Sequence, residues 1–277
     1  TQIPTFIRRA SKNDYLAENQ IRIREFSIAL FKDIPIQMVP EVVLINDRVE
    51  DYRINLLANI IFPYVQHSTM QIRNIVRSLP KEKQNEILST VIGKRRTKRD
   101  RSPRAFEYGY PINFDVVTGF AEYRDLQRHR MLTQQRQDMN VSLGYSVPEE
   151  IEEIGRGEVV QECFERAESL HSDLIKAGLV REAQYAPLFN HFIRWNMGMN
   201  LREFGHLTEL RSQKAGHPKY RRTVQVMAKL YMDRHPEMEP ILRFVDYNDY
   251  DQGITRAEQE ARTARKSLAT GVFDDMD

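Results

Sequence analysis

Phe106-Glu-Tyr-Gly-Tyr-Pro-Ile-Asn-Phe-Asp-Val-Val117 decides the fold class of this chain, because its strict alternation is typical of a half-buried β-strand. Residues 189–197 alternate more loosely and predict a second strand. Helical patterns occupy much of the remaining chain. The sequence therefore predicts an α+β fold. The alternating apolar positions of the first strand are Phe106, Tyr108, Tyr110, Ile112, Phe114 and Val116.

Helices are predicted on both sides of these strands. Apolar residues recur at helical spacing over 14–31, 49–63, 69–79 and 81–92, which predicts a helical layer. Downstream, helices are expected from Gly119, over 148–177 with Gly178 as a left-handed cap, over 201–211 and over 218–234. The polar tail shows at best a helix over 255–268. These patterns divide the chain into a helical extension (1–95), a core (96–245) and a polar tail (246–277).

Composition indicates an ordinary globular protein. The chain has 277 residues, of which 41% are hydrophobic and 29% charged, and a net charge of +2, so it can bury a large core. Cys163 is the only cysteine, which excludes an intrachain disulfide, and its apolar neighbours on a predicted helix favour a place in the core. No membrane span or leader is recognisable, and we expect a cytoplasmic protein.

A strongly basic run precedes the first predicted strand. Seven of the eleven residues 94–104 are Lys or Arg. Such a run can bind polyanions. It has no interleaved aromatic residues, so a linker that is mobile or contacts a partner is an equally good interpretation. Nucleic-acid binding through this run is the weakest of the functional hypotheses.

The tripeptide Arg128-His-Arg130 has the chemistry of an anion site. Its two guanidinium groups keep their charge at any accessible pH and suit phosphate or diphosphate. On an extended segment Arg128 and Arg130 would point to one face and His129 to the other. The alternative is that Arg124, Arg128 and Arg130 are solvated surface residues, neutralised by Glu122 and Asp125.

The stretch from Arg128 to Val141, R-H-R-M-L-T-Q-Q-R-Q-D-M-N-V, resembles the signature of the flavin-dependent thymidylate synthase family, R-H-R-x-x-S-x-N-E-x-S-x-R-Y. The first three positions agree, and Thr133 is a conservative match for the first Ser. Arg136 stands where the family has Glu, Asp138 where it has the second Ser and Asn140 where it has Arg. Gln184 replaces a further Arg that usually precedes a Leu-Pro pair. The substrate side of the motif is therefore altered.

A second motif follows about seventy residues later. The stretch from Asn200 to Arg211, N-L-R-E-F-G-H-L-T-E-L-R, is similar at every named position to the family pattern N-x-R-x-x-x-[N/H]-x-x-x-L-R. On a helix Arg202 and His206 share a face, and Arg211 lies about 140° further round than His206. Without the family, Arg202 and Arg211 would be read as surface residues paired with Glu203 and Glu209. The resemblance covers roughly residues 100–245.

The resemblance implies a cofactor, a reaction and an architecture. Family members hold FAD and move a methylene group from methylenetetrahydrofolate to dUMP, giving dTMP, with NADPH restoring the reduced flavin. They have a curved β-sheet flanked by helices and form homotetramers with cofactor sites between subunits. In this chain Arg211 would face the dUMP-like nucleotide, with Arg136 and Gln184 on the substrate side. The FAD-binding positions would be Arg128, His129, Arg130, Asn200, Arg202 and His206.

Two functional interpretations follow from the altered motif. In the first, the protein is an FAD-dependent enzyme with a changed dUMP site. In the second, it is a catalytically decayed copy that acts as a structural or regulatory partner of an active copy. Each lost phosphate contact removes roughly 1.5–3 kcal/mol. The two missing arginines would thus weaken substrate binding by about two to four orders of magnitude.

Overall fold

The computed structural model describes most of the chain between residues 40 and 250. The contacts divide the chain into Thr1–Val39 and Pro40–Asp277. In the first unit only residues 21–22 and 25–26 are described, and they are helical, so most of the helix predicted over 14–31 lies outside the described residues. In the tail, Glu258, Ala261 and Arg265 are helical, and the rest of the helix predicted there is not described. The described residues are 21–22, 25–26, 40–44, 49–93, 95–98, 100–109, 112–250, 258, 261 and 265.

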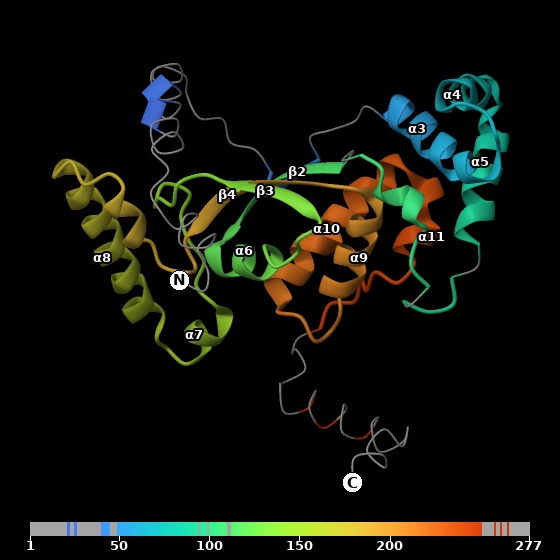
Figure 1. Ribbon diagram of the computed structural model, residues 1–277. Coiled ribbons are helices and arrows are strands. Elements are labelled where there is room, and N and C mark those ends of the chain that lie inside the picture. The colour runs from blue at the N-terminus through green and yellow to red at the C-terminus, as the bar shows by residue number, and fades with distance from the viewer. Residues whose placement is uncertain are drawn as a thin grey trace, which may run out of the picture. The chain divides into compact units, whose positions relative to one another are not determined.

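A four-stranded antiparallel sheet lies at the centre of the second unit (Figure 1). Its order is β1 (Val42–Leu44), β2 (Ile112–Gly119), β4 (Phe192–Met199) and β3 (Leu132–Arg136). The long central strands pair in a register that sets Ile112 opposite Met199 and Val116 opposite Trp195. Helices flank this sheet, which confirms the predicted α+β fold.

The two faces of the sheet differ in polarity. Phe114 and Trp195 point to the buried face, where the Phe114 ring stacks on Phe204 of α9 (Leu201–Arg211) at 5.7 Å. On the other face, Arg194 forms an ion pair with Asp115 at 3.0 Å. One apolar face and one polar face are typical of an antiparallel sheet that packs on one side only.

The helices expected before residue 95 are largely confirmed. They are α3 (Val49–Ile61), α4 (Thr69–Ser78) and α5 (Lys81–Ile92), and η1 (Phe62–Tyr64) follows α3. Strand β1 was not expected within this layer, and it pairs with β2 through Val42 opposite Val116. A three-residue strand is too short to leave an alternation signal in the sequence. The division of the chain at residue 95 stays a prediction.

The first predicted strand is wrong over its first half. Residues 104–107 form the 3-10 helix η2 (Arg104–Glu107), and β2 begins only at Ile112. Phe106 is fully buried from that 3-10 helix, so its place in the alternation reflects packing and not a strand. The residue at 111 is proline, which has no N–H to donate to a sheet ladder, a physical reason for a strand to begin after it.

The helix predicted over 148–177 is divided in two. Gly155 adopts a φ of +68° between α7 (Glu149–Glu153) and α8 (Gly157–Lys176). Gly178 has a φ of +78° just beyond α8, which confirms the predicted left-handed cap. Cys163 is exposed, so its predicted place in the core is wrong. The reason is that the buried residues of α8 are Phe164 and Ala167 alone, and Phe164 stacks on Tyr145 with ring centroids 3.8 Å apart. The helix is followed by η3 (Glu182–Tyr185).

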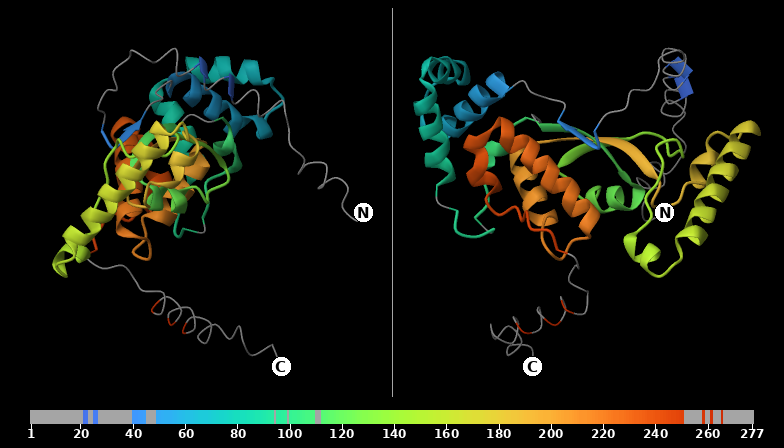
Figure 2. Two further views of the ribbon diagram at one scale, coloured as in Figure 1. Left: turned by 90° about the vertical axis from the view of Figure 1, so that its left-hand side faces the viewer. Right: turned by 180° about the vertical axis from the view of Figure 1, so that it is seen from behind.

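Three helices cover the buried face of the sheet, as the views in Figures 1 and 2 agree. They are α6 (Phe120–Leu126), α9 and α10 (Pro218–Arg234), followed by η4 (Pro236–Met238) and α11 (Glu239–Leu242). The Tyr123 ring meets Trp195 edge-on at 5.1 Å, and Tyr231 meets Phe204 at 5.0 Å. Among the described residues, none of the helices has both the length and the hydrophobicity that a membrane crossing requires.

Candidate functional site

The site is built around the first turns of α9, which starts where the central strand β4 ends. Asn200 follows Met199 directly, and its side-chain Oδ1 accepts the Glu203 N–H at 2.8 Å, which caps the helix. Asn200 is buried, with 3% of its surface exposed. The rigid sheet thus fixes both the position and the direction of α9.

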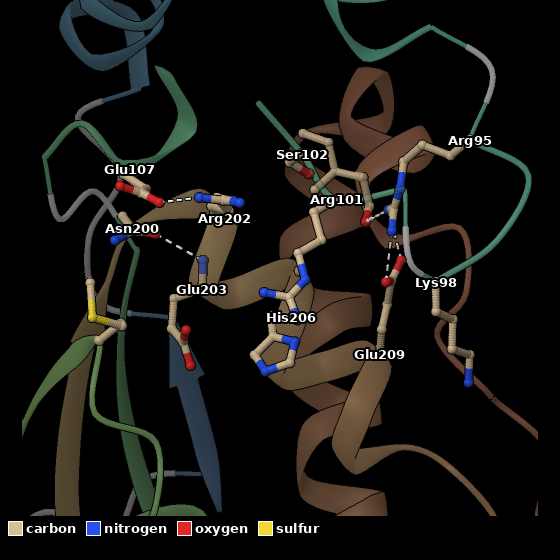
Figure 3. A pocket seen from close by; sticks show the side chains of 13 residues that line it. Arg95, Lys98, Arg101, Ser102, Glu107, Asn200, Arg202, Glu203, His206 and Glu209 are labelled. Atoms are coloured by element: carbon tan, nitrogen blue, oxygen red, sulfur yellow. Dashed lines mark hydrogen bonds and ion pairs between the residues drawn. The ribbon is translucent and has the colours of Figure 1, made fainter. Parts of the chain in front are cut away.

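A pocket of about 160 Å³ lies between α9 and the basic segment of residues 95–102 (Figure 3). Asn200, Arg202 and His206, three of the predicted FAD-binding residues, line it. The lining residues are Arg95, Lys98, Arg101, Ser102, Glu107, Met131, Asn200, Arg202, Glu203, Gly205, His206, Glu209 and Ile241.

Two of the arginines in the pocket are held by carboxylates of the same chain. Arg202 forms an ion pair with Glu107 of η2. Arg95 makes a two-pronged pair with Glu209, with nitrogen to oxygen distances of 2.8 and 2.9 Å, and both side chains are buried. Arg202 is therefore paired with neither Glu203 nor Glu209. The interpretation as a surface residue, made without the family resemblance, had expected such a pair. The idea that 94–104 is a mobile or partner-contacting linker is wrong for Arg95.

Lys98 and Arg101 also reach this pocket, and within the described part of the chain neither has a hydrogen bond or ion pair with a carboxylate. Figure 3 shows the Arg101 guanidinium beside the ring of His206. Desolvation by the surrounding protein lowers the pKa of His206, Glu203 opposes this shift, and the neighbouring His129 and Arg101 add to it. Most of the His206 side chains are therefore neutral at pH 7, and the uncompensated charge of the pocket is positive.

His129 joins the two sequence motifs. Its Nδ1 lies 2.6 Å from Glu203 Oε1, and its Nε2 accepts the Arg211 Nε–H at 3.0 Å. Because Nε2 is an acceptor, the proton sits on Nδ1 and is donated to Glu203. The His129 ring also meets the His206 ring at 5.8 Å. The two motifs therefore meet in the structure, and they do so through an imidazole.

The arginines on either side of His129 are both exposed. Residues 127–128 form a turn, so the extended segment that was predicted from Arg128 begins only at β3. Arg128 is 71% exposed and pairs with Asp125 at 3.5 Å, which is the solvated arrangement considered as the alternative. Arg130 is also exposed, and neither arginine lines the pocket that contains Arg202. Their contact with a cofactor stays a prediction.

The substrate-side positions have mainly local partners. Arg136 is exposed on β3 and donates to the Gln137 carbonyl at 3.0 Å. Gln184 accepts the Met139 N–H at 3.2 Å, and Asn140 accepts the Ser142 N–H at 2.9 Å. Where the family has arginines, Gln184 and Asn140 thus stabilise the loop that follows β3.

Arg211 differs from those positions, because its side chain is held from two sides. Its Nε is bonded to His129, and its guanidinium lies over the Tyr220 ring at 5.7 Å from the centroid. Its terminal Nη groups have no hydrogen bond within the described residues, so they can be presented to an anion. The part of the chain that the structure describes has no cluster of three or more His, Cys, Asp or Glu side chains that could hold a metal ion.

Several pocket residues have no counterpart among the sequence predictions. Arg95, Lys98, Arg101 and Ser102 come from the basic run, and Glu107 comes from the segment read as a strand. The sequence showed that lysine and arginine are concentrated in residues 94–104. No periodicity, however, indicated which side chains of the run face α9.

The sheet, the flanking helices and the two joined motifs define a class of protein, and comparison with known proteins identifies it. Residues 63–237 match the family model described as thymidylate synthase complementing protein, so the chain belongs to this family, the flavin-dependent thymidylate synthase family that its motifs resemble.

Curated relatives include UPF0159 proteins. The chain is 39% identical to one from Chlamydia muridarum over 201 residues, which are 73% of this chain and 37% of the relative. It is 29% identical to one from Thermoplasma acidophilum over 227 residues, 82% of this chain and 44% of that relative. The chain therefore spans about two fifths of the length of these relatives.

A solved structure shares the fold. It is a UMP/dUMP methylase, PolB from Streptomyces cacaoi, bound with 5-Br dUMP, and it matches with a TM-score of 0.56 at 15% sequence identity. The match covers 74% of this chain and 95% of that chain. At this level of identity the likeness shows the fold alone.

Proposed function

We propose that this protein binds FAD beside α9 and works as a flavin-dependent thymidylate synthase-like protein with an altered dUMP site. The observation that carries the proposal is the junction at His129, where Glu203 lies on one ring nitrogen and Arg211 on the other. That junction links the residues assigned to the cofactor with the arginine assigned to the nucleotide substrate. Membership of the family and the fold shared with a UMP/dUMP methylase support the same proposal.

The residues of the pocket fit the phosphate-bearing part of FAD. Its uncompensated charge is positive, and the N-terminus of α9 adds the positive end of a helix dipole. A volume of about 160 Å³ is below the roughly 300–1,000 Å³ of pockets that enclose whole ligands. The pocket would therefore hold only a portion of the dinucleotide. We propose that a second copy of the chain covers the remainder, in a homo-oligomer that would be the family's tetramer.

Each residue of the junction would have a definite task. Glu203 fixes the ring of His129, and His129 in turn fixes the guanidinium of Arg211, which would bind the phosphate of a dUMP-like nucleotide. Arg202, held by Glu107, would contact the cofactor with its remaining N–H groups. When bound, FAD supplies hydride chemistry that side chains cannot perform, with NADPH as the reductant and methylenetetrahydrofolate as the carbon donor.

A second candidate function rests on the substrate side. Gln184 and Asn140 hold a loop together where the family uses arginines, and Asp138 adds a negative charge nearby. These replacements favour a decayed copy that keeps the flavin site and supports an active copy. The longer relatives have room for further domains, because the matching region fills only 37–44% of their length.

One pair of measurements separates these proposals. Purified protein should take up FAD and show a flavin absorption spectrum. Tritium release from dUMP labelled at C5 is then measured with methylenetetrahydrofolate and NADPH, and an Arg211→Ala variant is the control for the substrate site. Release that depends on Arg211 supports the enzyme. FAD uptake without any release supports the decayed copy, and failure to take up FAD contradicts both.

A further inference from the structure

Most of the charged side chains that line the pocket already have a partner of opposite charge or a strong hydrogen bond. Arg95 is paired with Glu209, Arg202 with Glu107, and Glu203 is bonded to His129. The two arginine–glutamate pairs cancel in charge, and the bond to His129 keeps Glu203 in place. Lys98 and Arg101 are the cations that remain without such a partner among the described residues.

The segment that carries these two cations is held in shape by its own hydrogen bonds. The Asp100 carboxylate accepts the N–H groups of Arg96 and Thr97 at 2.6 and 2.9 Å, and these bonds lower the pKa of Asp100. The Arg95 Nε donates to the Asp100 carbonyl at 2.6 Å. Of this segment, the described residues 95–97 and 100 are therefore held together by hydrogen bonds from both sides.

A buried anchor fixes this turn to the rest of the molecule. Besides its pair with Glu209 of α9, Arg95 donates to the Ile241 carbonyl of α11 at 2.5 Å, and its own carbonyl accepts from Arg243 at 3.3 Å. Arg95 therefore acts as a positioning residue. It holds Lys98 and Arg101 across the pocket from the N-terminal half of α9.

We propose that Lys98 and Arg101 bind a phosphate or diphosphate group between the 95–102 turn and α9. Ser102 and His206 line the same space and add a hydroxyl and a ring nitrogen as further donors. This inference rests on the proposed function, since it assigns the anionic part of a nucleotide to the pocket. It also assigns the basic run a function in binding a small anionic ligand, which differs from the two earlier interpretations of a linker and of a nucleic-acid-binding segment.

The phosphate could belong to FAD or to the nucleotide substrate, and titrations distinguish the two. FAD and riboflavin, which has no phosphate, are titrated by flavin fluorescence, and dUMP and inorganic diphosphate by calorimetry. Wild type, Arg101→Gln, Lys98→Gln and Arg101→Lys are compared. The matched control is Arg166→Gln, which removes an exposed arginine of α8 that pairs with Glu162. Circular dichroism and thermal unfolding confirm that each variant is folded.

We expect Arg101→Gln and Lys98→Gln each to raise the Kd for the phosphate-bearing ligand roughly ten- to a hundredfold, the value of one charge-assisted contact. Riboflavin binding and the control variant should not change, and Arg101→Lys should keep part of the affinity. An effect on FAD assigns the group to the cofactor, and an effect on dUMP alone assigns it to the substrate.

The proposal is overturned if both Gln variants bind FAD, dUMP and diphosphate as wild type does, or if they weaken riboflavin as much as FAD. Failure of the proposed function looks different. In that case wild type would not bind FAD or dUMP, while diphosphate would still bind in a way that depends on Arg101. Wild-type protein that binds none of these ligands would reject both.

Discussion

His129 Nδ1 lies 2.6 Å from Glu203 Oε1, although the two residues are 74 positions apart in the chain. Both side chains are almost fully buried, with 5% and 9% exposed. The contact joins the turn after α6 to the first turn of α9, and it leaves the other ring nitrogen to receive Arg211. A single imidazole therefore sets the geometry between the two motifs.

This contact should appear as an energetic coupling. In a double-mutant cycle with His129→Ala and Glu203→Ala, we expect a coupling of about 0.5–3 kcal/mol, because both groups are buried and share a hydrogen bond. The free energy of unfolding of the four proteins is measured in urea. Lys83 and Glu86 form an exposed control pair, which should couple by less than about 1 kcal/mol. Additive effects at His129 and Glu203 would show that the bond contributes nothing.

Replacing Glu209 by Gln should destabilise the protein strongly. The change leaves the guanidinium of Arg95 buried without a counter-charge, which costs about 3–5 kcal/mol. The matched control is Glu162→Gln, whose partner Arg166 is exposed, and its effect should stay below about 1 kcal/mol. Chemical unfolding measures both. Equal effects of the two changes would contradict the buried position of Arg95.

Tyr52 should limit stability at alkaline pH. Burial raises its pKa, and burial likewise raises the pKa of Tyr231. The ionised phenolate is thus less favourable in the folded state than in the unfolded chain. The contribution of the neutral Tyr52 side chain to the free energy of unfolding is fully present below pH 10, the ordinary pKa of tyrosine. It is lost as the pH rises above this value.

The Tyr52→Phe variant should therefore lose less stability than wild type between about pH 10 and 12. At pH 7 it should be as stable as wild type or more stable by about 1 kcal/mol, because the buried hydroxyl has no hydrogen-bond partner among the described residues. Thermal unfolding across pH measures both effects. A variant that is clearly less stable at pH 7 would mean that the hydroxyl does have a partner.

Protonation of His191 should lower the stability of the protein at mildly acidic pH. Desolvation by burial lowers its pKa, Glu168 opposes the shift, and its Nδ1 accepts the Leu188 N–H at 2.8 Å. The unfolded chain takes up the proton more readily. The contribution of the neutral His191 side chain to the free energy of unfolding is therefore present above pH 6.5 and lost as the pH falls below it. Wild type should lose more stability than His191→Gln between about pH 7 and 5, and parallel pH profiles would reject this role.

Local patterns predict much of this fold. The helices α9 and α10 were expected at their observed bounds, because apolar residues recur at helical spacing and Asn200 and Pro218 mark where the helices start. The strand expected from Phe106 was misplaced, since a buried aromatic residue on a 3-10 helix leaves the same alternation as a strand residue. Strand β1 exists because β2 offers it an edge, which is a tertiary effect.

The site was only partly predictable for a similar reason. Motif spacing indicated that Arg202 and His206 share a helix face, and both line the pocket. The sequence could not show that Arg95 is buried, because its partner Glu209 lies more than a hundred residues away. It therefore could not separate Arg95 from Lys98 and Arg101, which have no carboxylate partner among the described residues. Arg128, whose chemistry suits an anion, instead pairs with Asp125 of α6.

The most direct test of the account is a crystal structure of the protein with FAD. We predict electron density for the diphosphate between the N-terminal half of α9 and the turn that carries Lys98 and Arg101, with His129 still bonded to Glu203 and Arg211. Density for FAD at a place that does not touch α9, or crystals that take up no FAD at saturating concentration, would contradict it.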